Sequence, residues 1–193
     1  MFRGEKLCGF LRKKTARQEE PKIKKEKELN KEIYMEISKL ITDDNSILSN
    51  LSLCFQNPKL YFEKNIERYS YRIESEENTD QVAWFAIVDE LIDGGIAVEL
   101  DWKEALNEFV SRMKELADNN NLHIEAAWFD ENEDIPVWCK VIDEKWERQG
   151  FCVGAIDIDS DSYVMFICKI EILKKLIILS KEINHRFDFA KNM

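Results

Sequence analysis

Three aspartates at alternate positions, Asp157, Asp159 and Asp161, interrupt the otherwise apolar stretch AIDIDSDSYVMF at residues 155–166. A strand projects alternate side chains to one face, so a strand that continued through all three would bring their carboxylates together. Hard cations such as Ca²⁺ and Mg²⁺ prefer oxygen ligands of this kind. One interpretation of the stretch is therefore a divalent-metal site in an enzyme or a sensor.

The same aspartates have a second interpretation as a turn. The EF-hand loop also opens D-x-D-x-D, but its sixth position here is Ser162 instead of glycine and its twelfth is Cys168 instead of glutamate, which excludes an EF-hand. Asp and Ser side chains bond to nearby backbone amides, and DSDS between two β-prone runs is typical of a hairpin turn. On this interpretation Asp157 and Asp159 lie on the exposed face of a half-solvated strand.

A second group of chemistry-bearing residues combines carboxylates with tryptophan. Residues 89–104 contain six acidic side chains against one lysine, and residues 125–134 contain five with no basic side chain. Aromatic anchors inside a charged rim give protein interfaces affinity and a fast association rate, so an acidic rim beside Trp84, Trp128 and Trp138 predicts a basic protein partner; the alternative is that the tryptophans form a core. The candidate partner-binding residues are Asp101, Trp102, Trp128, Asp130, Glu131, Asp159, Asp161 and Tyr163.

Signatures of the common enzyme classes are absent from the sequence. HExxH, GxSxG, GxxxxGK[ST] and GxGxxG do not occur, and neither His123 nor His185 lies near a nucleophile in a known signature. With six glycines in all, the chain has little from which to build a phosphate-binding loop. We therefore expect no catalytic residue and no cofactor, although catalytic groups that converge from distant segments leave no such signature.

Charge is unevenly distributed along the chain. Residues 1–28 carry ten basic against five acidic side chains, a net of +5, and residues 29–193 carry 18 against 33, a net of −15, which together give the −10 of the whole chain. The acidic body repels phosphate backbones, so we expect no nucleic-acid binding by the folded domain. Five cysteines without a CxxC motif favour the reducing cytoplasm, and no transmembrane segment or secretory signal is expected.

Helical periodicity dominates the part of the chain that precedes these candidate sites. Apolar residues at helical spacing predict a helix from about residue 22 to 41 that continues to residue 55. Asn57 and Pro58 then predict the start of another helix. A polar break at residues 74–80 separates this helical front, residues 29–74, from the rest.

Strands and helices alternate in residues 79–185, which must hold the candidate sites. We expect helices over 79–93, 101–116, 134–149 and 171–184, and strands over 96–100, 122–129, 151–159 and 162–169, the last two forming a hairpin. Asp101 with Glu104 predicts a capping box for the second helix. The fold class is α+β: a helical N-terminal region and then a roughly four-stranded, mainly antiparallel sheet with helices packed on it. We expect one acidic domain at residues 29–193, preceded by a basic, mobile tail at residues 1–28.

Two blocks carry a resemblance to a known family. The stretches WFAIVDELIDGGIAVELDWKE at 84–104 and GAIDIDSDSYVMF at 154–166, followed by a helix, resemble a family of uncharacterised bacterial proteins described only as a domain of unknown function. The resemblance covers about residues 79–185 and leaves the basic tail outside. It implies a small cytoplasmic bacterial protein and supplies no activity, cofactor or site residue.

Overall fold

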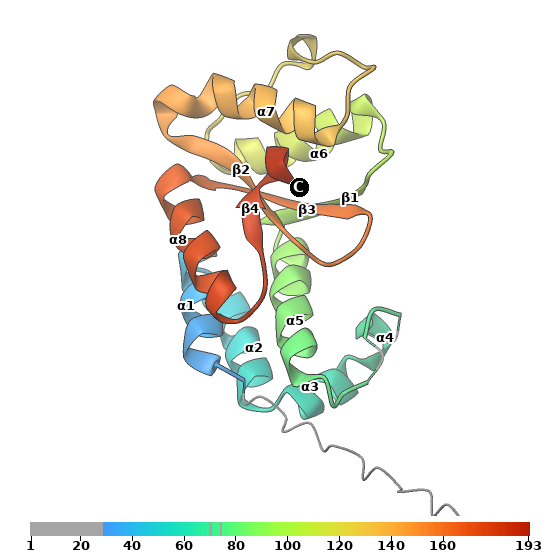
Figure 1. Ribbon diagram of the computed structural model, residues 1–193, viewed down its shortest axis with the longest axis vertical. Helices are drawn as coiled ribbons and strands as arrows, with labels where there is room; N and C mark the ends of the chain where they lie inside the picture. Colours follow the sequence, from blue (N-terminus) through green and yellow to red (C-terminus); the bar gives the residue numbers. More distant parts are fainter. Residues whose placement is uncertain (1–28, 70, 74) are drawn as a thin grey trace, which may run out of the picture.

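A computed structural model describes residues 29–69, 71–73 and 75–193, which fold as an α+β protein (Figure 1). The helices are α1 (Lys31–Ile41), α2 (Asn45–Gln56), α3 (Pro58–Lys64), α4 (Ile66–Tyr69), α5 (Thr79–Asp93), α6 (Leu106–Asp118), α7 (Ile135–Trp146) and α8 (Ile170–Glu182). The strands are β1 (Ala97–Asp101), β2 (Phe151–Ile156), β3 (Ser162–Lys169) and β4 (Phe187–Phe189). The predicted tail at residues 1–28, with the expected start of the first helix, lies outside the described residues.

The four strands form one antiparallel sheet in the order β1-β3-β2-β4. The predicted fold class is confirmed, including the hairpin of β2 and β3, but one strand was wrongly placed. Residues 122–129 contain only a 3-10 turn at Ala126–Trp128, and the fourth strand is β4, which pairs with β2 through Phe187 opposite Ile156.

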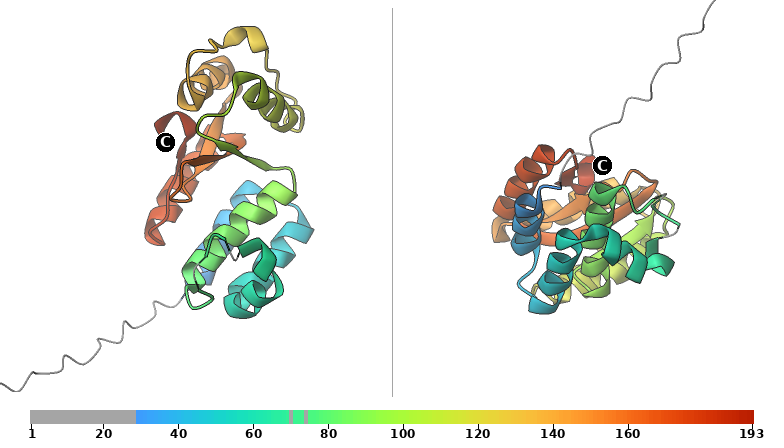
Figure 2. Two further views of the ribbon diagram at one scale, coloured as in Figure 1. Left: turned by 90° about the vertical axis from the view of Figure 1, so that its right-hand side faces the viewer. Right: turned by 90° about the horizontal axis from the view of Figure 1, so that it is seen from below.

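The sheet separates two hydrophobic cores, and helices cover both of its faces (Figure 2). Because alternate side chains of a strand point to opposite faces, Val164 and Phe166 of β3 pack among α1, α2, α5 and α8, whereas Met165 and Ile167 pack against α6 and α7. The result is a layer of helices, a sheet and a second layer of helices. None of the helices in the described part of the chain is long and apolar enough to cross a membrane.

Local sequence signals explain most of the helix starts. Asn57 accepts a hydrogen bond from the N–H of Leu60, and Asp134 caps α7 in the same way, as predicted. The single helix expected to reach residue 55 is two helices, because Thr42 is extended and Asp44 caps α2. The cap of α5 is Asn78, one residue before the predicted cap Thr79.

Helix α5 lies at the centre of the larger core, as its apolar composition predicts. Every residue from Val82 to Leu91 is buried, including Asp89 and Glu90, each 8% exposed. A buried carboxylate needs compensating partners, because removing its charge from water costs several kcal/mol. The partners of these two carboxylates therefore decide what the acidic stretch that begins at residue 89 does.

Candidate functional site

The three aspartates of the sequence lie in the loop between β2 and β3. Strand β2 ends at Ile156, so the expected continuation of the strand through Asp157 and Asp159 is wrong. The carboxylate of Asp157 accepts a hydrogen bond from the N–H of Asp159 at 3.0 Å, and Ser160 Oγ accepts one from the next strand in the same way. Asp159 has a φ of 55°, in the left-handed region that Asp tolerates better than most residues. The loop is a turn, as the second interpretation predicts, but Asp157 and Asp159 lie in the turn itself and not on a strand.

The turn geometry bears directly on the metal interpretation. Asp157 points one oxygen at Arg186, 3.8 Å from its Nη1, while Asp159 and Asp161 are exposed. In residues 29–69, 71–73 and 75–193, no three side chains of His, Cys, Asp or Glu are grouped so that they could hold a metal ion. The structure therefore offers the three aspartates no shared site for a cation.

The end of β1 lies beside this loop. Asp101 pairs with Ser162 of β3, and the N–H of Trp102 donates to the carbonyl of Asp161 at 3.1 Å. Asp101 does not cap a helix: its carboxylate accepts from the N–H of Lys103 in a turn, and α6 begins only at Leu106. The predicted capping box is wrong because the strand pairing extends through Asp101 and carries the chain past the edge of the sheet.

The side chains at this end of the sheet form what we call the hairpin face: Asp101, Trp102, Asp161 and Tyr163. Trp102, Asp161 and Tyr163 line a cavity of about 350 Å³, which Asp157 and Arg186 also line. Trp102 is 50% exposed, and its ring carries the Lys103 ammonium at 4.5 Å from the centroid. The structure thus gathers four of the eight predicted partner-binding residues around one exposed indole.

Three further predicted residues lie elsewhere, in the loop between α6 and α7. Trp128 is half-buried with the Lys145 ammonium 5.3 Å from its ring, and Asp130 and Glu131 are exposed. Hydrogen bonds from the N–H and side chain of Asn132 lower the pKa of Asp130. We call this second patch the acidic loop.

Buried tryptophans hold both acidic segments in place. Trp84 and Trp138 are 2% and 3% exposed, so the expected rim with these two as surface anchors is wrong. Their indole N–H groups donate to backbone carbonyls at 2.8 Å, Trp84 to Asp157 in the hairpin loop and Trp138 to Asp130 in the acidic loop. A buried polar group needs a partner, and here that need fixes the position of a surface loop.

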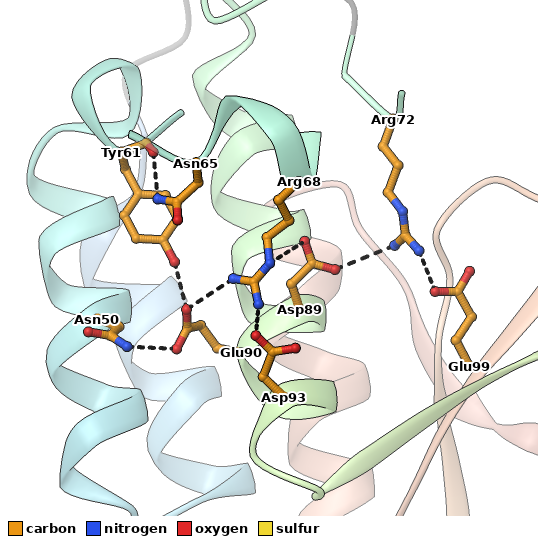
Figure 3. A network of polar contacts seen from close by, with 9 residues as sticks. All are labelled: Asn50, Tyr61, Asn65, Arg68, Arg72, Asp89, Glu90, Asp93 and Glu99. Atoms are coloured by element: carbon orange, nitrogen blue, oxygen red, sulfur yellow. Dashed lines mark hydrogen bonds and ion pairs between the residues drawn. The ribbon is translucent and has the colours of Figure 1, made fainter. Parts of the chain in front are cut away.

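A second set of carboxylates, which we call the α5 stripe, consists of Asp89, Glu90, Asp93 and Glu99 (Figure 3). Arg68 reaches three of them: it lies 3.3 Å from Glu90, 3.8 Å from Asp89 and in contact with Asp93. Arg72 lies 2.5 Å from Glu99 and 3.5 Å from Asp89. Each carboxylate of the stripe is therefore paired within the chain, with two arginines from one short segment that offset half of its four negative charges.

Hydrogen bonds complete the interior end of the stripe. Glu90 accepts from the Tyr61 hydroxyl at 2.8 Å and from the Asn50 amide at 2.9 Å (Figure 3). Burial raises the pKa of Asp89 to about 6, although Arg72 and Arg68 act in the opposite direction. These contacts join α2, α3 and the segment after α3 to α5. The role of the α5 stripe is therefore structural.

A further cluster, centred on His185, was not found in the sequence. The His185 ring stacks on Trp84 with centroids 4.1 Å apart and planes 4° apart, and its Nε2 lies 3.0 Å from Asp80. Asp80 also accepts from the buried Tyr34 hydroxyl at 2.9 Å. His185, Trp84 and Asp80 border a cavity of about 440 Å³, into which the hairpin loop contributes Asp159. No local motif signals the cluster, because Asp80 and His185 alone are 105 residues apart.

Comparison with known proteins gives one match. A protein-family model described as a domain of unknown function (DUF6630) matches residues 33–190, which include the hairpin face, the acidic loop, the α5 stripe and the His185 cavity. The match begins well before residue 79, so it also covers the helical front. No curated protein and no solved structure matches the chain.

Proposed function

The chain belongs to the DUF6630 family, a domain of unknown function, and from this premise we propose that it is a protein-interaction module whose hairpin face binds a basic protein partner. The observation that carries the proposal is the half-exposed Trp102 between the exposed carboxylates of Asp101 and Asp161. Tryptophan, with tyrosine and arginine, is enriched among the side chains that supply most of the binding energy at protein interfaces.

The electrostatics of the face support a basic partner. Asp101 and Asp161 make no ion pair with any residue that the structure describes, so no cation of the described chain compensates their charge. Arg186, which lines the adjoining cavity, is already bound to Asp188 at 2.9 Å. A cationic side chain of a partner finds both an aromatic face and free carboxylates here.

The wider charge distribution supports the same proposal. The net charge of −15 over residues 29–193 attracts a basic protein from a distance and raises its association rate. The acidic loop adds to this negative field. The pKa of the Tyr163 hydroxyl on the hairpin face is raised by burial and then by the charge of Asp134, which lies at the end of that loop. The acidic field equally disfavours a nucleic acid as the partner.

A specific form of this function is an immunity-type protein that neutralises a basic toxin. Such a role requires a preformed acidic surface, and the bonds from buried Trp84 to Asp157 and from Trp138 to Asp130 supply the rigidity. We place this activity in the cytoplasm, where the free thiols of Cys54, Cys139, Cys152 and Cys168 stay reduced.

The test compares capture of partners by the full-length protein and by two charge-matched double variants. Asp101→Asn/Asp161→Asn removes two charges from the hairpin face, and Glu171→Gln/Glu182→Gln removes two exposed charges from α8. We expect a basic protein whose affinity falls about fivefold to tenfold in the first variant, stays unchanged in the second and decreases with salt. Capture of acidic proteins alone, or equal losses in the two variants, would contradict the proposal.

A further inference from the structure

We propose that the cavity beside His185 is a second binding site, which takes a small ligand that carries a cationic nitrogen, an ammonium or a guanidinium group. Its volume of about 440 Å³ is in the range of small-molecule sites. Three distant segments build it: the start of α5, the hairpin loop and the turn between α8 and β4. It shares Asp157, Ile158 and Arg186 with the cavity at the hairpin face but not Trp102, so it does not depend on a protein partner there.

In its neutral form, the ring of His185 offers a hydrogen-bond acceptor. The Asp80 carboxylate lies against Nε2, so a neutral imidazole carries its proton on that nitrogen and leaves the lone pair of Nδ1 bare. Within the described residues Nδ1 has no hydrogen-bond partner. The described atoms that are both buried and unpartnered do not include it, so Nδ1 is accessible. A ligand N–H in the cavity completes this nitrogen.

The acceptor is preorganised by buried side chains. Tyr34, which is fully buried, donates to the second oxygen of Asp80 and fixes the carboxylate. Trp84 stacks on the imidazole and donates its N–H to the carbonyl of Asp157, so one buried indole positions both the ring and the loop opposite it. A site whose groups are already oriented loses little entropy when a ligand binds.

The charges around the cavity select a cation. The side chain of Asp157 is 40% exposed, and Asp159 is exposed on the same wall. The basic side chain of the lining, Arg186, is bound to Asp188 at 2.9 Å and to the carbonyl of Asn192 at 2.9 Å, and its Nη1 lies 3.8 Å from Asp157. An anion would face two carboxylates, whereas an ammonium or guanidinium group donates to these carboxylates and to His185.

The chain offers a sensitive probe because it has only two histidines, His123 and His185. The ring nitrogens are observed by ¹⁵N NMR in the full-length protein during titration with agmatine, which has one guanidinium and one ammonium group. We expect a saturable shift of the His185 signals at millimolar or lower agmatine, with His123 unmoved. 1,6-Hexanediol, of similar size and without charge, is expected to leave both histidines unmoved.

Two variants of one loop separate this site from general attraction to an acidic protein. Asp159 lines the His185 cavity and Asp161 does not, although both are exposed and carry the same charge. Asp159→Asn keeps a side chain that tolerates the left-handed backbone, and we expect it to weaken agmatine binding about fivefold. Asp161→Asn is expected to leave it unchanged. His185→Phe keeps an aromatic ring on Trp84 and is expected to abolish binding, as measured by calorimetry.

The failure of this site is distinguishable from failure of the hairpin face. An unmoved His185 at millimolar agmatine overturns the site, as does equal weakening by Asp159→Asn and Asp161→Asn. If agmatine leaves His185 unmoved while a captured basic protein shifts it, the cavity receives a side chain of that protein, and the small-ligand proposal is overturned while the interaction module stands.

Discussion

Two acidic regions of this protein use carboxylate side chains in opposite ways. In the α5 stripe, Asp89 and Glu90 are buried and face Arg68 and Arg72 from the same chain (Figure 3). At the hairpin face, the carboxylates are exposed, and the cation beside them is Lys103, which sits over the Trp102 ring. One set of carboxylates is closed within the fold and the other is open to solvent.

The difference follows from the cost of burying charge. A carboxylate inside the protein loses its hydration, so the fold must supply arginines or hydrogen bonds in its place. On the surface water solvates the carboxylate, and no cation from the chain is needed. The acidic residues of the stretch 89–104 therefore divide by their partners: the first four face Arg68 and Arg72 within the fold, and Asp101 remains available to a partner.

The largest test of this division removes the cation of the stripe. Arg68→Met leaves Asp89 and Glu90 buried without their shared guanidinium, and we expect a loss of about 3–5 kcal/mol in the free energy of unfolding. The control is Arg112→Met, whose partner Glu115 is 61% exposed, with an expected loss below about 1 kcal/mol. Urea unfolding measures both, and losses of equal size would refute a structural role for the stripe.

A pH profile tests the same region through Asp89. Its pKa is about 6 in the folded protein against an ordinary value of 3.8, so between these pH values the folded state holds a proton that the unfolded chain has lost. Stability therefore falls as pH rises from about 4 to about 6, by up to about 3 kcal/mol, and this contribution is constant outside that window. Asp89→Asn is expected to remove the slope in urea unfolding, whereas Asp161→Asn at the exposed face retains it. A slope unchanged in Asp89→Asn would show that other groups cause it.

A substitution of Trp102 tests the hairpin face. Trp102→Ala is expected to weaken binding of the captured basic protein by about 2 kcal/mol, because an exposed tryptophan contributes its energy on binding. The free energy of unfolding should change by less than about 1 kcal/mol, since half of the side chain is exposed. Calorimetry and urea unfolding of one preparation give both values. A large stability loss with unchanged affinity would assign Trp102 to the fold.

The fold was predictable where local signals act alone, as the caps Asn57 and Asp134 show. Residues 122–129 alternate like a strand, but Leu122 and Ile124 are buried by α6 and α7, and the carbonyl of His123 accepts from the Trp146 indole instead of from a neighbouring strand. β4 has three residues, too few for a pattern, and exists through its pairing with β2. In both places tertiary contacts decide the structure.

The candidate sites were predictable to the extent that their residues are close along the chain or paired in the sheet. Trp102, Asp161 and Tyr163 come together because β1 and β3 pair at this edge. The pairing of Asp80 with His185 has no such signal, since α5 and the turn after α8 meet only in the folded core. A count of acidic residues also does not reveal that Arg68 and Arg72 occupy the α5 stripe.

The smallest expected effect comes from removing the cation at the hairpin face, and it contrasts directly with removal of the arginine in the α5 stripe. Lys103 lies over the Trp102 ring and competes there with the cation of a partner, so Lys103→Met is expected to strengthen binding of the basic protein about threefold, the scale of an exposed cation–π contact. Stability should not change, in contrast to the loss in Arg68→Met. The measurement is calorimetry at two salt concentrations, with Lys145→Met, which removes the cation near Trp128 on the acidic loop, as the matched control. Both variants make the protein more acidic by one charge. A gain in affinity confined to Lys103→Met therefore identifies Trp102 as the contact. An equal gain in both variants would attribute the effect to net charge alone.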